Sequence, residues 1–172
     1  LGLRRSAVQE SIRLAADLND EGVQTIIFTR TRRGVELLLT NLRSQGADEA
    51  RNAGSRGGSA DLRVRGYRSG YLPSHRREIE RGLRQGSVRT VVATNALELG
   101  IDIGGMDAAL LVGYPGSIAS TRQQAGRAGR GMETAIAVMI ATPDPLDQFL
   151  VSHPDFIFDS SPEAALINPD NL

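Results

Sequence analysis

The chain has 172 residues, a formal net charge of zero at pH 7, 40% hydrophobic and 23% charged residues, and no cysteine. This size suits one domain that buries about 70% of its unfolded surface, and the lack of cysteine excludes disulfides and thiolate metal sites. No apolar run approaches the ~20 residues that a membrane-spanning helix needs, and the N-terminus lacks the apolar stretch of a signal peptide. We therefore expect a cytoplasmic protein with no membrane partner and, because the sequence starts without Met, a fragment of a longer chain.

The basic residues are unusual in kind and in placement. All 20 are arginine, so the G-x-x-x-x-G-K-[ST] phosphate loop, which needs a lysine, is excluded from this chain. Eight arginines fall between Leu62 and Thr90 against two glutamates, whereas seven acids and no arginine occur from Gly131 onward. A basic centre beside an acidic C-terminal part indicates a face that binds a polyanion and a separate docking surface.

Helical and strand patterns alternate from the start of the chain. Apolar residues at helical spacing predict a helix at 4–18, and the apolar run at 25–29 predicts a buried strand. A second helical pattern follows at 31–42. The stretch at 44–61 is rich in Gly, Ser and Ala and is interpreted as a flexible insertion.

The alternation continues through the second half of the chain. A strand is expected at 62–67, and a helix begins at Pro73, a residue favoured in the first helical turn, and runs to Leu83. Further buried strands are expected at 89–94, 108–112 and 135–141. A helix is expected between the last two strands, and residues 123–130 are expected to end it.

The order of these elements predicts the fold class. Strands that alternate with helices indicate an α/β domain with a mostly parallel central sheet and helices on both faces. We expect this domain to span residues 1–142. The five prolines and the acidic bias of residues 143–172 predict one short helix followed by an extended tail.

Polar clusters follow three of the predicted strands. They are Thr29-Arg30, Arg68-Ser69-Gly70 and Thr94-Asn95. In open parallel sheets, ligands bind outside the carboxyl ends of the strands. Hydroxyls, glycine backbone and arginines grip a phosphodiester backbone without reading its bases. Each cluster alone is typical of an ordinary strand-end turn, but the three together favour a nucleic-acid track.

The segment from Gln123 to Arg130 combines two arginines with two glycines. Gln123, Arg127 and Arg130 are spaced i, i+4 and i+7, which predicts one shared face on any helix formed there. Gly126 and Gly129 would each cost such a helix about 1 kcal/mol relative to alanine, which indicates close approach of a ligand or another surface. Two guanidiniums on that face would suit a phosphate. The alternative is a solvated arginine face with incidental glycines.

No metal site is predicted from the sequence. His75 and His153 have no second ligand at suitable spacing. Asp48-Glu49-Ala50-Arg51 is similar to a Mg²⁺-binding acidic tetrad, but no apolar strand precedes it, so we interpret the match as a coincidence.

Four motifs in order resemble the second RecA-like lobe of superfamily 2 helicases. Residues 25–30 resemble motif IV, 70–73 with Arg76 and Arg77 resemble the segment after it, 93–104 resemble motif V, and 123–130 have the Q-x-x-G-R-x-G-R form of motif VI. A narrower resemblance, to DNA repair helicases of the Hrq and MrfA type, is carried by residues 67–73, 113–120 and 145–154.

The resemblance implies a three-layer RecA-like fold and an ATP site shared with a first RecA-like lobe of the same polypeptide. That lobe would carry the P-loop lysine and most of the Mg²⁺ ligands, so this chain alone is expected to be inactive. Arg127 and Arg130 would be catalytic arginine fingers that neutralise charge on the γ-phosphate. The other residues implied in ATP binding are Gly100, Asp102 and Gln123.

The resemblance also implies a binding track for single-stranded DNA, along which the full motor would move in the 3′ to 5′ direction. The residues that would hold successive phosphates are Thr29, Arg30, Arg68, Gly70, Thr94 and Asn95. The expected function is the second motor lobe of an ATP-dependent helicase. The alternatives are a non-catalytic nucleic-acid-binding module, a lobe of an RNA helicase, and a free-standing α/β enzyme. The last is least favoured, because the sequence contains neither a glycine-rich nucleotide-binding fingerprint nor a convincing nucleophile–base pair.

Overall fold

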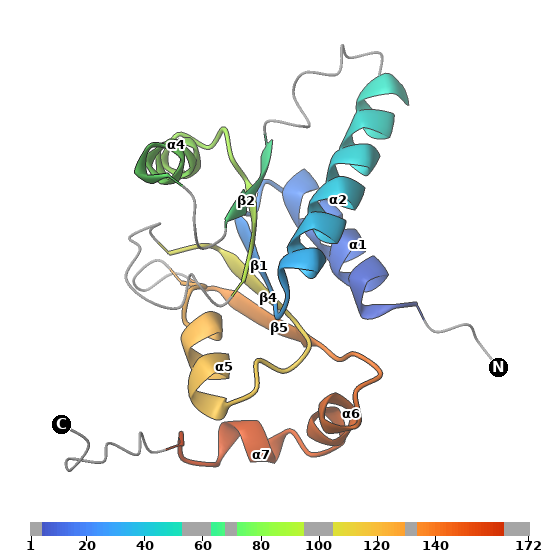
Figure 1. Ribbon diagram of the computed structural model, residues 1–172, viewed down its shortest axis with the longest axis vertical. Coiled ribbons are helices and arrows are strands. Elements are labelled where there is room, and N and C mark those ends of the chain that lie inside the picture. Colours follow the sequence, from blue (N-terminus) through green and yellow to red (C-terminus); the bar gives the residue numbers. More distant parts are fainter. Residues whose placement is uncertain (1–4, 53–62, 68–71, 95–104, 130–133, 164–172) are drawn as a thin grey trace.

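The computed structural model describes residues 5–52, 63–67, 72–94, 105–129 and 134–163, and a parallel β-sheet forms its centre (Figure 1). The strands are β1 (Thr25–Thr29), β2 (Val64–Tyr67), β3 (Thr90–Ala93), β4 (Ala108–Val112) and β5 (Ile136–Ile140). Their order is β2-β3-β1-β4-β5, and every neighbouring pair is parallel. All carboxyl ends therefore lie along one side of the sheet, which we call the carboxyl edge. Each strand falls within its predicted range.

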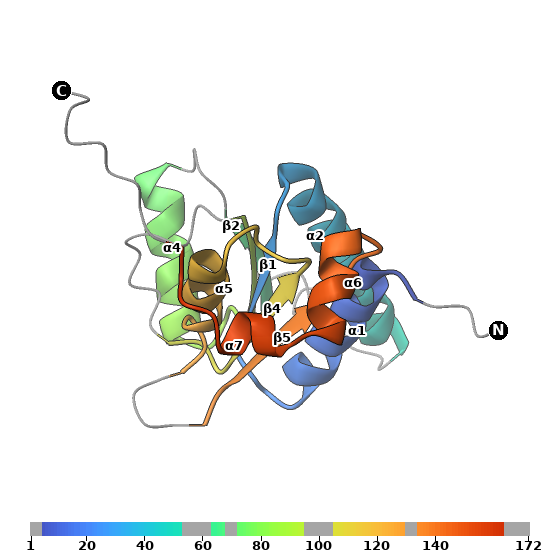
Figure 2. The ribbon, with the colours of Figure 1, turned by 90° about the horizontal axis from the view of Figure 1, so that it is seen from below.

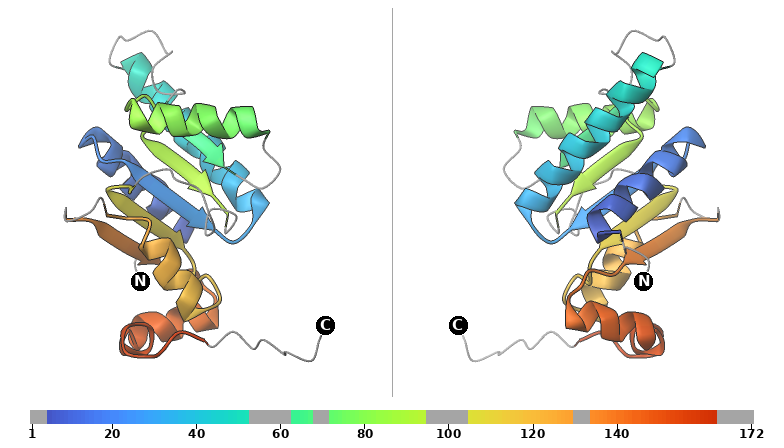
Figure 3. Two further views of the ribbon diagram at one scale, coloured as in Figure 1. Left: turned by 90° about the vertical axis from the view of Figure 1, so that its left-hand side faces the viewer. Right: turned by 90° about the vertical axis from the view of Figure 1, so that its right-hand side faces the viewer.

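Helices cover both faces of the sheet (Figures 2 and 3). On one face lie α1 (Ala7–Asp20) and α2 (Arg32–Asn52), and on the other α4 (Pro73–Arg84) and α5 (Ile118–Ala125). The last helices, α6 (Pro145–Ser152) and α7 (Asp155–Phe158), lie below α5 in Figure 1. None of the helices in the described part of the chain combines the length and apolarity needed to cross a membrane.

The alternation of side chains along each strand divides the core into two clusters. In β1, Ile27 packs with the apolar faces of α1 and α2, whereas Ile26 and Phe28 pack with Ile79 and Leu83 of α4. All residues of β1, β3 and β4 are buried, as expected for strands covered on both faces. The apolar runs of the sequence thus fix the middle layer of the domain.

Strand β5 differs from the prediction of a buried strand. Its first residues are exposed, with Ile136 at 50%, and only Ile140 is buried. The reason is its place in the strand order, since β5 is the outer strand beside β4. Apolar composition predicted a strand here correctly, but composition carries no information on which strand lies at the edge.

Two helix boundaries also differ from the prediction. Helix α1 begins at Ala7 rather than Arg4, because the Ser6 side chain accepts from the Gln9 N–H while the Gln9 side chain accepts from the Ser6 N–H, at 3.2 and 3.1 Å. The flexible insertion expected from residue 44 is wrong for residues 44–52, where α2 continues. Ala47, Glu49, Ala50 and Arg51 are good helix formers and offset the single Gly46. Residues 53–61 of that insertion lie outside the described residues.

The C-terminal part carries two helices where one was predicted. Proline disfavours helical geometry in the residue before it, and His153 accordingly leaves the helix at φ −132° and ψ 65°. Pro154 then starts the short helix α7. The described residues from 143 to 163 therefore fold against the domain instead of extending away from it (Figure 2).

Candidate functional site

The carboxyl edge brings predicted nucleic-acid residues of two strands, β1 and β3, side by side. Phe28 of β1 and Tyr67 of β2 both pair with Ala93 of β3, so Thr29 and Thr94, one residue further along, are neighbours at the strand ends. Arg68, Gly70 and Asn95 lie outside the described residues. The shared edge that the sequence predicted is therefore present, with described members from β1 and β3.

Thr29 is buried against the first turn of α2. A β-carbon on Gly34 would overlap the Thr29 hydroxyl, so the glycine lets the helix approach the end of β1. The N-terminus of α2 is capped nearby, because the Gly34 N–H donates to Thr31 Oγ1 at 3.0 Å. A ligand at this edge meets the end of β1 and the start of α2 together.

Arg30 lies on the surface of the same edge. Its Nη2 is 3.6 Å from Asp144 Oδ2, and the two side chains are 47% and 38% exposed. Asp144 precedes α6 and accepts from the Leu146 N–H at 3.0 Å as its N-cap. The C-terminal part of the chain thus supplies a carboxylate to a predicted phosphate-binding arginine, a contact that the sequence did not reveal.

Asp147 is a second acid that the sequence analysis missed. It is fully buried. Its Oδ1 accepts from the Tyr114 N–H at 3.0 Å, and its Oδ2 accepts from the N–H and the hydroxyl of Thr142 at 2.8 and 2.7 Å. This carboxylate ties the loop after β4 to the loop after β5. The sequence signal that could have indicated its burial is its position three residues before the apolar Leu150, which places both residues on the same helical face.

Tyr67 and Arg76 form a further contact at the end of β2. The Arg76 guanidinium carbon lies 5.9 Å from the centre of the Tyr67 ring, within the range of a cation–π interaction. Burial raises the pKa of the Tyr67 hydroxyl, and the charge of Arg76 opposes that rise. Within the described residues the buried Arg76 Nε has no hydrogen-bond partner, so contact of the guanidinium with the Tyr67 ring compensates part of its burial.

The segment from Gln123 to Gly129 does not form the single helical face that its spacing predicted. Helix α5 ends at Ala125 and Gly126 is its C-cap, so Arg127 already lies beyond the helix. Gly129 has φ +118°, a conformation that residues with a side chain rarely adopt. The glycines therefore end the helix and turn the chain. Gln123 is exposed on α5, and Arg130 lies outside the described residues.

Beyond α5 the chain pairs with Met106, which lies two residues after the predicted motif V segment. The Met106 N–H donates to the Arg127 carbonyl at 2.9 Å, and the Gly129 N–H donates to the Met106 carbonyl at 2.7 Å. Ala128 and Met106 form a parallel β-bridge between these bonds, and Met106 is fully buried. Gly100 and Asp102 precede Met106 in sequence and lie outside the described residues.

This pairing lies at the opposite end of the sheet from Thr29 and Thr94. Met106 comes just before β4, whose first residue pairs with Thr25 at the start of β1. The two groups of predicted site residues are therefore separated by the length of the strands. Helix α5 connects them, since it begins after β4 at the carboxyl edge and ends just before Arg127. Among the described residues, no group of three or more His, Cys, Asp or Glu side chains is placed to hold a metal ion.

Comparison with known proteins gives a consistent result. Residues 6–132 match the helicase conserved C-terminal domain. The chain is 48% identical over all of its 172 residues to the ATP-dependent helicase YprA of Bacillus subtilis, of which it covers 22%. It is 41% identical over 158 residues to the ATP-dependent helicase HRQ1 of Saccharomyces cerevisiae, covering 91% of this chain and 14% of that protein.

A solved structure agrees with these relatives. The crystal structure of the DUF1998 helicase MrfA bound to DNA and AMPPNP is similar with a TM-score of 0.87 and 48% identity. The similarity covers 99% of this chain and 23% of that one. The chain thus spans less than a quarter of the length of each of these three proteins.

Proposed function

The chain belongs to the helicase conserved C-terminal domain family, and from this premise we propose that it is the second motor lobe of an ATP-dependent DNA helicase. The expected RecA-like fold and the resemblance to superfamily 2 helicases of the Hrq and MrfA type are confirmed by the sheet, by the family match and by the relatives. ATP hydrolysis and DNA translocation belong to the full-length protein that carries this lobe with a first one.

The observation that carries the proposal is the backbone pairing of Met106 with Arg127 and Gly129. It joins Met106, two residues beyond the motif V segment, to the motif VI segment through two hydrogen bonds of 2.9 and 2.7 Å. These bonds hold the backbone at Arg127, and a guanidinium that extends from it would neutralise charge developing on a phosphate. Arg127 therefore suits the role of an arginine finger toward the γ-phosphate of ATP, with Arg130, Gln123, Gly100 and Asp102 as further members of the same half-site.

The lobe supplies only half of that site. The sequence contains no lysine and hence no P-loop, so the phosphates are bound by the first lobe in this proposal. The described residues also offer no acidic cluster for Mg²⁺. The first lobe would hold the metal as well, and hydrolysis would depend on closure of the two lobes around ATP.

The carboxyl edge is proposed to bind single-stranded DNA. Thr29 and Thr94 lie side by side there, and Arg30 is exposed next to them. Together with Arg68, Gly70 and Asn95, these groups would contact the phosphate backbone, which gives binding without base specificity. The MrfA structure contains DNA and AMPPNP together, in agreement with a lobe that serves both ligands.

Substitution of Arg127 tests the proposal in the full-length protein. Arg127→Ala is expected to lower DNA-stimulated ATP hydrolysis by about 10³-fold or more, the usual effect of losing an arginine finger, while single-stranded DNA binding is retained. Arg13→Ala is the matched control, because Arg13 is an exposed arginine on α1, across the sheet from α5. Unchanged hydrolysis in Arg127→Ala would exclude the finger role and favour a non-catalytic nucleic-acid-binding module.

A further inference from the structure

Residues 154–163, which we call the strap, run from the start of α7 back along helix α5 (Figure 2). They lie beyond residue 132, where the match to the general helicase domain ends. Two polar contacts, one at each end of α5, attach the strap to this helix.

The first contact is at the N-terminus of α5. The Ile118 and Ala119 N–H groups donate to the two carboxylate oxygens of Glu163 at 2.8 and 3.0 Å. Ser117, the N-cap, accepts from the Ser120 N–H at 3.0 Å. Three of the helix's otherwise unpaired N–H groups are thus satisfied, two of them by the strap. These two hydrogen bonds lower the pKa of Glu163, so the carboxylate is charged at neutral pH.

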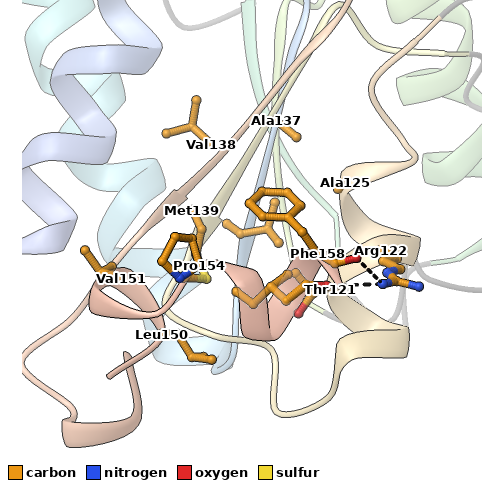
Figure 4. A pocket seen from close by; sticks show the side chains of 12 residues that line it. Thr121, Arg122, Ala125, Ala137, Val138, Met139, Leu150, Val151, Pro154 and Phe158 are labelled. Carbon is orange, nitrogen blue, oxygen red and sulfur yellow. Dashed lines mark hydrogen bonds between the residues drawn. The ribbon is translucent and has the colours of Figure 1, made fainter. Parts of the chain in front are cut away.

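The second contact is near the C-terminal end of α5. Arg122 Nη2 donates to the carbonyls of Ile157 and Phe158 at 3.2 and 3.0 Å (Figure 4). It also donates to the carbonyl of Ser160 at 2.7 Å. One guanidinium therefore contacts two carbonyl groups at the end of α7 and one just beyond it.

The apolar side chains of the strap do not pack closely against α5 and β5. A cavity of about 490 Å³ separates them, lined by Thr121 and Ala125 of α5, Val138 and Met139 of β5, and Ile157 and Phe158 of the strap (Figure 4). Phe158 is 75% exposed. The two polar contacts join the strap to α5 beside this cavity.

The place of α5 matters because Arg127 follows it directly. The helix has only eight residues, of which Ile118, Thr121 and Gln124 are buried, and so short a helix is not stable without tertiary contacts. The C-cap Gly126 then links the helix to Arg127, so a shift of α5 along the sheet also displaces Arg127.

We propose that Arg122 and Glu163 are positioning residues that fix α5 at both ends and thereby set the place of Arg127 at the ATP site. This inference rests on the proposed function of Arg127. In this proposal, displacement of Glu163 from the start of α5 slows ATP hydrolysis through a shift of Arg127, without any contact to ATP or DNA.

Steady-state kinetics of the full-length protein test this role. Arg122→Ala is expected to lower the kcat of DNA-stimulated hydrolysis by about 10- to 100-fold, the range for a catalytic group displaced by about 1 Å. KM for ATP and the affinity for single-stranded DNA should stay within about twofold of the parent value, because Arg122 contacts the strap and neither substrate. Arg122→Lys should restore most of the loss, since an ammonium has three donors for the three carbonyls.

The matched control for Arg122→Ala is Arg13→Ala, and the matched control for Glu163→Gln is Glu10→Gln. Both control residues are ion-paired on α1, and their substitution should leave kcat unchanged. Glu163→Gln keeps an oxygen acceptor and should lose less kcat than Arg122→Ala. If the control variants lose as much kcat as Arg122→Ala and Glu163→Gln, the loss reflects lower stability of the whole domain, and the proposal is overturned.

A double substitution separates this proposal from the finger assignment. If Arg122 acts through Arg127, then Arg122→Ala has no further effect on kcat in an Arg127→Ala background. Full activity of Arg127→Ala would refute the proposed function itself. Two outcomes would refute the positioning role while leaving Arg127 as the arginine finger. In both, Arg127→Ala strongly lowers kcat. In the first, Arg122→Ala has normal kcat, and in the second, Arg122→Ala lowers kcat equally with and without Arg127→Ala.

Discussion

Arg30 and Asp144 form an ion pair that joins the end of β1 to the N-cap of α6, with 3.6 Å between Arg30 Nη2 and Asp144 Oδ2. Both side chains are partly exposed, so the pair is worth at most about 1 kcal/mol. In the proposed function, a DNA phosphate at the carboxyl edge would carry the same sign of charge as the carboxylate and would bind the same guanidinium. The C-terminal part of the lobe and the DNA are therefore expected to compete for Arg30.

Binding of single-stranded DNA provides the test of this competition. Arg30→Ala should weaken binding and reduce the slope of log affinity against log salt by about 0.7, the value for one phosphate contact on a single strand. Asp144→Asn should strengthen binding by up to about fivefold, because it removes the competitor, while asparagine still caps α6. Both are measured by titration at several salt concentrations. Weaker binding by Asp144→Asn would mean that the acid orients Arg30 instead of competing for it.

Gly34 allows α2 to contact the end of β1. Alanine is about 1 kcal/mol more favourable than glycine inside a helix, so Gly34→Ala would stabilise the chain if space were available. Its β-carbon would, however, overlap the Thr29 hydroxyl and lie 3.2 Å from Thr31 Oγ1. We expect Gly34→Ala to destabilise the fold by about 1–3 kcal/mol in urea unfolding.

The overlap with Thr29 can be removed by a second substitution. In a Thr29→Ala background, Gly34→Ala should lose most of its penalty, so the two changes are strongly non-additive. Additive effects would show that the cost of Gly34→Ala arises elsewhere in the first turn of α2.

The contact of Glu163 with α5 predicts a dependence of stability on pH. The pKa of Glu163 is lowered by the hydrogen bonds from the Ile118 and Ala119 N–H groups. A lowered pKa stabilises the folded chain at pH values above the ordinary glutamate pKa of about 4.3, and this contribution is lost as pH falls through the lower folded value. Glu163→Gln should therefore lower the unfolding midpoint at neutral pH and have no effect in strong acid.

Glu10 provides the comparison for this titration. Its pKa is lowered as well, chiefly by the hydrogen bond from Arg13, so the parent chain loses stability in acid for more than one reason. The difference between the parent and Glu163→Gln isolates the contribution of Glu163. A difference that stays constant from pH 7 down to pH 2 would contradict the assignment of the shift to the charged carboxylate.

Much of the fold could be predicted because its signals are local. The runs at 25–29 and 108–112 became β1 and β4 with the same bounds, since a short apolar run buried on both faces has one stable conformation in a parallel sheet. Pro73 marked the first residue of α4 for a similarly local reason. The prediction was wrong where the outcome depended on neighbours, as for the exposed strand β5. The helix before β5 ends within residues 123–130 as predicted, but it ends before Arg127, so Gln123 and Arg127 share no helical face.

The sequence by itself determined the strands, the missing lysine and the order of the motifs, because these follow from neighbouring residues and from composition. Only the tertiary structure decided that Arg30 meets Asp144, that Met106 pairs with Arg127, and that Glu163 caps the start of α5. These contacts join residues far apart in the chain. They exist because the strand order β1-β4-β5 brings the C-terminal part back beside the first strand, and no local pattern encodes that order.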